Sequence, residues 1–266
     1  MQNERIKYTA CPLCRSADIR GFVKADLRGF PMWREPLEPC MIWMICGDCE
    51  HVFAEGYFTD EALRIVFEKT NEAQVVGLDL ERQRYTSAKM VERVTEVIGL
   101  ADSRLWVDVG FGSGSLLLTA KEFGFDVFGV DIRKKNVDDI SVFGVRGHHG
   151  SITSARHAVT FETRPTVISM TDVVEHEPFP LDSLRSARAL IADSGVLLIS
   201  MPNAGAPLWG FLNGKKDNPY WAEMEHYHNF TRESLYSVLQ QTGFSPIRYA
   251  VSERYRCCME VLARAV

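Results

Sequence analysis

The sequence of 266 residues lacks any apolar run near the roughly 20 residues that a membrane-spanning helix requires. It has no internal repeat, and the segment from Met1 to Arg5 lacks the basic stretch followed by an apolar one that marks a signal peptide. Positive charge is not in excess either, since 30 basic side chains face 35 acidic ones and the net charge is −5. A polyphosphate backbone would find no general attraction, which disfavours a nucleic-acid partner. We expect a cytoplasmic globular protein without a membrane span.

Seven cysteines are present, and an odd number without a secretion signal argues against a disulfide framework. Four of them form two CxxC pairs, Cys11 with Cys14 and Cys46 with Cys49. Each pair can turn two thiolates toward one point, and two pairs complete the tetrahedral site that zinc prefers. The alternatives are two unrelated reduced pairs or a thioredoxin-like redox motif, although a redox pair is single and set in a βαβ unit. The pattern predicts a structural zinc ribbon over residues 1–56, and it does not distinguish zinc from iron.

Helical and strand-like patterns follow the ribbon. Apolar residues at helical spacing predict helices over 59–69 and 79–98, in a connector or substrate cap spanning 57–100. From residue 105 onward short apolar runs alternate with helical stretches, which is typical of a parallel sheet covered on both faces. The runs that predict strands are 105–109, 127–130, 142–147, 166–171, 195–201, 245–251 and 256–263, the last two as an antiparallel hairpin. We therefore predict an α/β fold with a Rossmann-like domain over 101–266.

A glycine-rich turn follows the first of these runs. Gly110, Gly112 and Gly114 precede a helical stretch, and such a turn lets the backbone approach a nucleotide-like ligand where a side chain would collide. The third glycine comes one residue earlier than in the dinucleotide pattern GxGxxG. Asp108 stands two residues before the first glycine, and Asp131 ends the next strand, where a carboxylate can accept both hydroxyls of a ribose.

Five motifs in order carry a family resemblance. They are Val107-Asp108-Val109-Gly110-Phe111-Gly112-Ser113-Gly114, Gly129-Val130-Asp131, Thr171-Asp172-Val173-Val174-Glu175-His176, Ser200-Met201-Pro202-Asn203, and a final stretch from Glu225 to Leu235 with Thr242-Gly243-Phe244. Over about residues 80–266 the chain resembles class I S-adenosylmethionine-dependent methyltransferases. It is similar to the branch that contains ubiquinone-type O-methyltransferases and many methyltransferases of sugars and natural products. Some members of this group, including certain sugar C-methyltransferases, also begin with a zinc ribbon.

The resemblance implies a doubly wound, seven-stranded and mostly parallel sheet whose last strand is antiparallel, with S-adenosylmethionine as the cofactor. It implies that the glycines wrap the methionine part of the cofactor with Asp108 near its amino group, while Asp131 holds the ribose. The other residues that it assigns to the cofactor site are Ile132 on the adenine, Ser151 and Ile152 at the adenine edge, Thr171 and Asp172 near the methionyl chain, and Phe111 and Tyr85.

Methyl transfer from a sulfonium needs mainly positioning, and a base only where the acceptor is protonated. The candidate catalytic residues are Glu175, His176, His226 and His228. Glu175 could orient an imidazole or bind a divalent metal with His176, and the structural alternatives are a cap on the strand end and docking of the following helix. An insertion over about 204–225 is rich in aromatic residues and predicts a substrate lid, or packing against the N-terminal part of the chain.

The predicted function is methyl transfer to a small molecule, with oxygen favoured over carbon as the acceptor and a sugar or nucleotide-linked sugar as a substrate class. One alternative is an RNA methyltransferase that grips nucleic acid with the ribbon. Residues 1–56 carry no basic patch, which weighs against it. Another is a non-catalytic scaffold that binds the cofactor and recruits a partner through the ribbon.

Overall fold

The computed structural model describes residues 4–73, 75–98, 104–254 and 257–266, which form two compact units. The first unit combines residues 4–73 with 175–180 and 202–235, and the second contains the remaining described residues. The predicted boundary at residue 101 and the predicted strand start at Arg256 lie outside the described residues. Within the described ranges, no helix has the length and apolar character that crossing a membrane demands.

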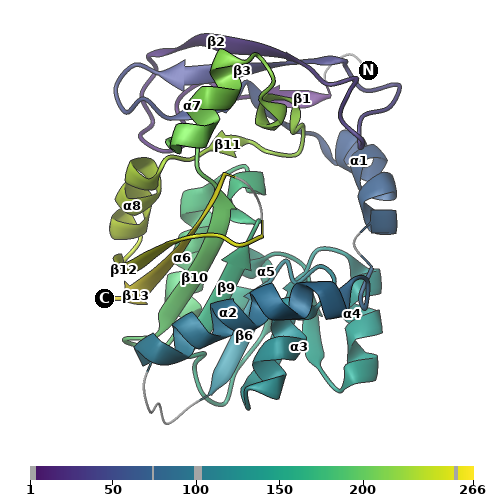
Figure 1. Cartoon of the computed structure of the whole chain (residues 1–266), viewed down its shortest axis with the longest axis vertical. Helices are drawn as coiled ribbons and strands as arrows, with labels where there is room; N and C mark the ends of the chain where they lie inside the picture. The colour runs from purple at the N-terminus through teal and green to yellow at the C-terminus, as the bar shows by residue number, and fades with distance from the viewer. Residues whose placement is uncertain (1–3, 74, 99–103, 255–256) are drawn as a thin grey trace. The chain divides into compact units, whose positions relative to one another are not determined.

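The second unit is built on a seven-stranded sheet in the order β12-β13-β10-β9-β6-β7-β8 (Figure 1). The strands are β6 (Leu105–Val109), β7 (Asp126–Asp131), β8 (Arg146–His149), β9 (Val167–Thr171), β10 (Val196–Pro202), β12 (Phe244–Val251) and β13 (Cys258–Ala265). The pairs β6–β7, β7–β8, β6–β9 and β9–β10 are parallel, and β12 and β13 pair antiparallel. The predicted fold class is thereby confirmed.

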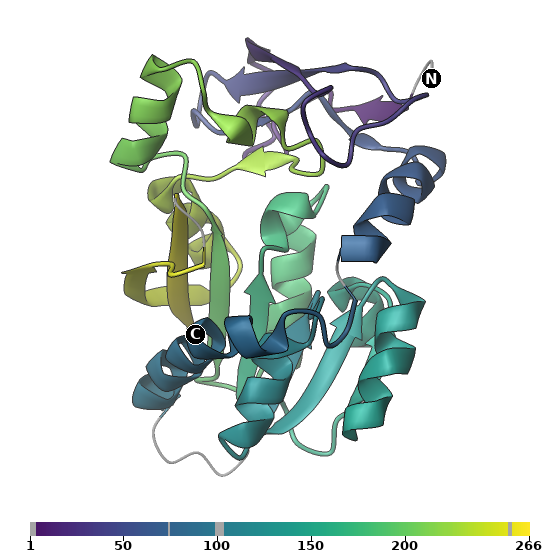
Figure 2. The ribbon, with the colours of Figure 1, turned by 45° about the vertical axis from the view of Figure 1, so that its right-hand side comes forward.

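Burial along the central strands explains why they read as apolar runs. Every residue of β10 is buried, as are the first four of β9, because helices cover both faces of the sheet (Figures 1 and 2). The helices are α2 (Leu80–Ile98), α3 (Ser115–Glu122), α4 (Lys134–Ile140), α5 (Ile152–Ala158), α6 (Pro180–Leu190) and α8 (Arg232–Gln241). On one face Met90 and Val94 of α2 and Leu116 of α3 pack with Trp106 of β6 in a buried cluster.

The order of the parallel strands reverses between β6 and β9. From β6 the chain continues outward to β7 and β8, and it then returns to β9 on the other side of β6. In open α/β sheets, ligands bind at the carboxyl ends of the strands at such a switch point. We therefore expect a ligand site among the residues that follow β6, β7 and β9.

The predicted strand over 142–147 differs from the observed structure. A short 3-10 helix, η1 (Ser141–Phe143), occupies its first half, and β8 begins only at Arg146. Val142 is 84% exposed, so its apolar character reports no burial. Gly144 reverses the chain between the two elements with φ of 65°, a conformation that glycine adopts without strain.

The first unit holds two small sheets. One has the order β11-β4-β3-β2 and the other pairs β1 with β5, all antiparallel. Its strands are β1 (Arg5–Lys7), β2 (Ile19–Asp26), β3 (Cys40–Cys46), β4 (Val52–Ala54), β5 (Gly56–Phe58) and β11 (His228–Asn229). Its helices are α1 (Asp60–Ala73), α7 (Pro207–Gly214), and the 3-10 turns η2 (Val174–His176), which begins in the second unit, and η3 (Pro219–Ala222).

The insertion over 204–225 contributes to the core of this first unit. Met224 is buried in one cluster with Met41 and Trp43 of β3, and Trp221 packs against this cluster. The indole N–H of Trp43 donates a 2.9 Å hydrogen bond to the carbonyl of Trp221, and the two rings meet edge to face. Trp221 of the insertion thus has packing partners in the N-terminal sheet, and the role of the insertion as a substrate lid stays a prediction.

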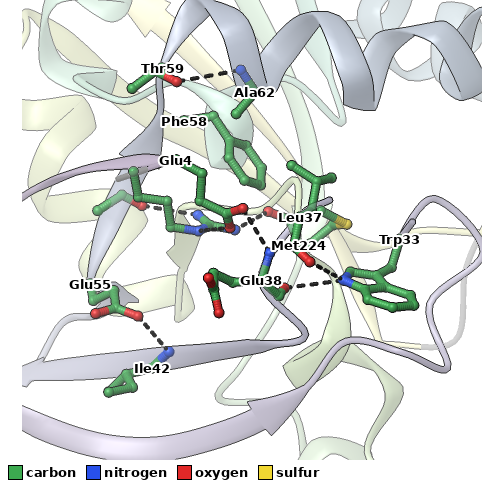
Figure 3. A network of polar contacts seen from close by, with 12 residues as sticks. Glu4, Trp33, Leu37, Glu38, Ile42, Glu55, Phe58, Thr59, Ala62 and Met224 are labelled. Carbon is green, nitrogen blue, oxygen red and sulfur yellow. Dashed lines mark hydrogen bonds and ion pairs between the residues drawn. The ribbon is translucent and has the colours of Figure 1, made fainter. Parts of the chain in front are cut away.

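Buried charges tie the N-terminal strand to this core (Figure 3). The carboxylate of Glu4 accepts a 2.8 Å hydrogen bond from the backbone N–H of Glu38. The guanidinium of Arg5 lies 3.8 Å from the ring centre of Phe58 and donates to the carbonyl of Met224 at 3.1 Å. Segments distant in the sequence are joined by these contacts, so β1 is an integral part of the unit.

Candidate active site

The four predicted zinc ligands come together in the first unit. The ligand atoms of Cys11, Cys14, Cys46 and Cys49 all lie within 4.8 Å of one another. The Sγ atoms of Cys11 and Cys49 are 3.6 Å apart, and those of Cys14 and Cys46 are 3.5 Å apart. Thiolates around tetrahedral zinc at about 2.3 Å from the metal stand about 3.8 Å apart. The cluster is therefore compatible with a zinc ribbon.

The backbone of each CxxC segment forms a tight turn that explains this convergence. The N–H of Arg15 donates to the carbonyl of Cys11, and the N–H of Glu50 donates to that of Cys46. Arg15 and Glu50 both have positive φ, 64° and 57°, and end the turns in the left-handed conformation. Cys40, at the start of β3, does not belong to the four-cysteine group.

A buried histidine pair lies near the second CxxC segment in the chain. His51 Nε2 is 3.0 Å from His228 Nδ1, and His228 Nε2 is 3.0 Å from the carbonyl oxygen of Glu177. Burial lowers the pKa of His228 to about 4, so its ring is neutral at physiological pH. Both ring nitrogens of His228 have protein partners, which favours a structural role. Its assignment as a catalytic residue stays a prediction.

The other three candidate catalytic residues form a second cluster in the same unit. Ligand atoms of Glu175, His176 and His226 lie within 4.8 Å of one another, and Glu175 and His226 are buried. The rings of His176 and His226 meet edge to face with their centres 4.6 Å apart. Burial and the neighbouring His176 hold the pKa of His226 well below its usual value. A neutral imidazole can accept a proton or coordinate a metal.

In the second unit, the three glycines of the turn after β6 all have positive φ. Gly110, Gly112 and Gly114 have φ values of 66°, 52° and 81°, which side-chain-bearing residues rarely adopt. A Cβ atom at Gly110 would lie 2.6 Å from the side chain of Val173, so the turn also packs closely against the segment that follows β9. Phe111 is buried in a core cluster, which leaves its backbone, and not its ring, for a ligand.

Asp131, at the end of β7, links its strand to the glycine turn. Its carboxylate accepts hydrogen bonds from the backbone N–H of Gly112 at 3.2 Å and from that of Arg133 at 2.8 Å. The Arg133 guanidinium also contacts it at 3.1 Å, and Asn136 donates to it at 3.4 Å. A ribose would find a charged acceptor here and would compete with Arg133 for it. Ile132 beside it is 51% exposed and offers an apolar surface suited to a base.

The remaining residues that were predicted to bind the cofactor differ in their burial and in their hydrogen-bond partners. Ser151 caps α5 by accepting a 3.2 Å hydrogen bond from the N–H of Ser154, and the side chain of Ile152 is fully buried. Tyr85 is 66% exposed on α2. Asp172 has a positive φ of 54° and forms a 3.2 Å ion pair with Arg254. Thr171, just before it, ends β9 and is partly exposed.

Asp108 is fully buried in β6 and belongs to a network that the sequence analysis missed. Ser169 donates a 2.6 Å hydrogen bond to Asp108, and the indole N–H of Trp106 donates to Ser169 at 2.7 Å. Burial raises the pKa of Asp108 to about 7, although the Ser169 hydroxyl and the charge of Arg254 oppose this. A serine inside an otherwise apolar strand was the available sequence signal for Ser169.

Several of the predicted cofactor residues, although not Tyr85, Ser151 or Ile152, thus lie where β6, β7 and β9 end, on either side of the strand-order reversal. Gly110–Gly114, Asp131 and Thr171 follow or end these strands. Arg133, Asn136, Ser169 and Arg254 join them in the structure without having been predicted. The carboxyl edge of a Rossmann-like sheet with a glycine turn and an acidic residue after the second strand suits an adenosine-containing ligand.

Comparison with known proteins identifies the family. A methyltransferase domain family matches residues 80–249. Ubiquinone biosynthesis O-methyltransferase of Roseobacter denitrificans is 27% identical over 149 residues, which cover 53% of this chain and 60% of that protein. The enzyme of the same name from Bordetella avium is 26% identical over 120 residues, 42% of this chain and 48% of that protein. The chain thus matches about half the length of these relatives.

Solved structures share the fold. The 1,6-didemethyltoxoflavin-N1-methyltransferase of Burkholderia thailandensis, with 1,6-didemethyltoxoflavin and S-adenosylhomocysteine bound, has a TM-score of 0.59 at 16% identity, covering 82% of this chain and 97% of that one. Magnesium protoporphyrin IX methyltransferase of Synechocystis PCC 6803 has a TM-score of 0.51 at 17% identity, covering 69% and 83%. Since the family match spans more than half of the sequence, the chain belongs to the methyltransferase domain family, and its resemblance to class I S-adenosylmethionine-dependent methyltransferases is confirmed.

Proposed function

We propose that this chain transfers the methyl group of S-adenosylmethionine to a hydroxyl group of a small molecule. The observation that carries the proposal is the convergence of the glycine turn, Asp108 and Asp131 at the carboxyl ends of the neighbouring parallel strands β6 and β7. When bound, S-adenosylmethionine supplies an activated methyl that passes to the acceptor oxygen as its S–C bond breaks, leaving S-adenosylhomocysteine.

The residues of the second unit would hold the cofactor. The carboxylate of Asp131 would accept hydrogen bonds from the ribose hydroxyls, and the exposed side chain of Ile132 would cover the adenine. Asp108, when ionised, would attract the ammonium group of the methionine part. Thr171 and Asp172 would line the methionyl chain, and Ser151 would lie at the adenine edge. This cofactor fits the donor set, because two carboxylates and a side-chain-free turn match a ribose, an ammonium and a carboxylate-bearing chain.

The proton of the acceptor hydroxyl would be taken up at the cluster of Glu175, His176 and His226. A hydroxyl needs to lose its proton as the new O–C bond forms, and a neutral imidazole is a suitable acceptor for it. Oxygen is favoured over carbon because both matched relatives are named O-methyltransferases. A saccharide or nucleotide-linked sugar is the first substrate class to test. Neither the charge of the chain nor its N-terminal unit favours RNA.

Zinc bound by the four cysteines would have a structural role in this enzyme. A site with four protein thiolates leaves no position for a substrate, so its contribution would be to the folding of the first unit. The spacing of the Sγ atoms supports this assignment.

The proposal is tested by calorimetric titration of the purified chain with S-adenosylhomocysteine, with NAD as the control ligand. Binding of S-adenosylhomocysteine in the micromolar range without a response to NAD is expected. Candidate hydroxyl acceptors are then screened with S-adenosylmethionine carrying a labelled methyl group. Absence of S-adenosylhomocysteine binding, or a preference for NAD, would refute the proposed cofactor.

A further inference from the structure

Three hydrogen bonds join the segment 175–177 to the segment 225–228. The N–H of Tyr227 donates to the carbonyl of Glu175 at 2.8 Å. His176 Nδ1 lies 3.0 Å from the carbonyl oxygen of Glu225, and His228 Nε2 lies 3.0 Å from that of Glu177. Both segments belong to the first unit, and these bonds fix Glu175 and His176 beside His226.

The hydrogen bonds also determine which ring nitrogens remain available. A carbonyl oxygen only accepts hydrogen bonds, so the neutral form of His176 would carry its proton on Nδ1 and have a lone pair on Nε2. His226 Nδ1 is buried and has no hydrogen-bond partner, while its Nε2 lies 3.8 Å from the carboxylate of Glu223. In metal sites, a histidine typically donates its second ring N–H to a carbonyl or a carboxylate, as the positions of Glu225 and Glu223 would allow here.

We propose that Glu175, His176 and His226 bind a divalent transition-metal ion, separate from the four-cysteine site. The ligand atoms would be a carboxylate oxygen of Glu175, Nε2 of His176 and Nδ1 of His226. Two imidazoles and one carboxylate form a ligand set that zinc and iron(II) sites use, with a coordination position left open.

The observed spacing is close to what coordination requires. Two ligands at about 2.1 Å from one ion are at most about 4.2 Å apart. One possible ligand atom from each of the three residues lies within 4.8 Å of the others, so small side-chain movements would be enough to bring three ligands to this distance. His176 is only partly buried, which leaves one side of the cluster accessible.

The role of this metal in catalysis rests on the proposed function. An acceptor hydroxyl at the open coordination position would release its proton to water more readily, because a bound cation lowers the pKa of a coordinated oxygen. Binding of the metal itself does not depend on methyl transfer.

The test uses zinc as the probe and counts bound ions. Full-length chain is saturated with zinc, freed of excess metal by gel filtration and analysed by mass spectrometry of its metal content. The wild-type chain should retain two zinc ions, and Glu175→Gln and His226→Gln should each retain one. His157→Gln is the matched control, since His157 is exposed on α5 and lies outside the cluster, and it should retain two.

The outcomes separate the metal site from the proposed activity. A single zinc ion in the wild-type chain, or two in both cluster variants, would overturn the metal site. Circular dichroism and affinity for S-adenosylhomocysteine check that each variant is folded. A variant that has lost one zinc but binds S-adenosylhomocysteine normally supports the proposal. A wild-type chain that binds two zinc ions and transfers no methyl group would refute the proposed function and leave the metal site standing.

Discussion

Ser169 and Asp108 lie opposite each other on the parallel strands β9 and β6, and the hydroxyl of Ser169 donates a 2.6 Å hydrogen bond to the Asp108 carboxylate. Trp106 holds the Ser169 hydroxyl in turn. The carboxyl group is fully buried, and burial outweighs the hydrogen bond, so the pKa of Asp108 is raised to about 7. If Asp108 lies beside the cofactor ammonium as proposed, that charge would stabilise its ionised form, and the residue would couple stability, pH and ligand binding.

Asp108→Asn should change how stability depends on pH. In the unfolded chain the carboxyl ionises near pH 4, whereas in the folded chain it keeps its proton up to about pH 7. The folded state therefore binds more protons between these values, and the free energy of unfolding falls as pH rises through this window, by about 1.4 kcal/mol for each unit of pKa. The asparagine variant has no carboxyl group at this position, so its free energy of unfolding does not show this decrease. Urea denaturation at pH 5 and pH 8 should show a smaller decrease for the variant than for the wild-type chain, and equal decreases would contradict the buried-acid interpretation.

Asp131→Ala should weaken binding of S-adenosylhomocysteine by about 10- to 100-fold, because the ribose hydroxyls would lose charge-assisted hydrogen bonds. Calorimetric titration measures the change. Asp138→Ala is the matched control, since Asp138 is an exposed residue of α4 that pairs with Lys134. Unchanged affinity in a folded Asp131→Ala variant would place the adenosine elsewhere.

Cys14→Ser should remove one zinc ion and lower the thermal stability of the chain, because the free energy of metal binding to such a site, on the order of 10 kcal/mol, is also folding free energy. Cys40→Ser is its control. Cys40 lies in β3 outside the four-cysteine group, so the variant should keep its zinc. The four-thiolate assignment fails if Cys14→Ser retains full metal content and an unchanged melting temperature.

The sequence predicted the parts of this molecule that depend on local pattern. The strand 105–109 and the meeting of the two CxxC pairs follow from an apolar run and from residue spacing, and they agree with the structure. The prediction of a strand over 142–147 was wrong in its first half, because an apolar residue such as Val142 can be exposed.

Features that depend on contacts between distant segments could not be read in this way. The Ser169–Asp108 hydrogen bond requires the strand order, and the competition of Arg133 for Asp131 requires a side-chain conformation. The adjacency of His176 and His226 comes from hydrogen bonds between segments about 50 residues apart in the chain, such as that between His176 and Glu225. Tertiary pairing of this kind leaves no periodic signal in the sequence.

His226→Gln should lower kcat for methyl transfer by about 100- to 10,000-fold, the range expected for loss of a general base or of a ligand that activates the acceptor. The affinity for S-adenosylhomocysteine should stay the same, because His226 is not among the residues proposed to hold the cofactor. His157→Gln provides the control with normal kcat. His226 is proposed both as a general base and as a metal ligand, and these roles are distinguished by adding zinc to the variant and measuring its metal content and its kcat. A lowered kcat with unchanged zinc content indicates a base, and the loss of one zinc ion indicates a ligand. Normal turnover by His226→Gln would exclude His226 from the chemistry, whether as a base or as a metal ligand.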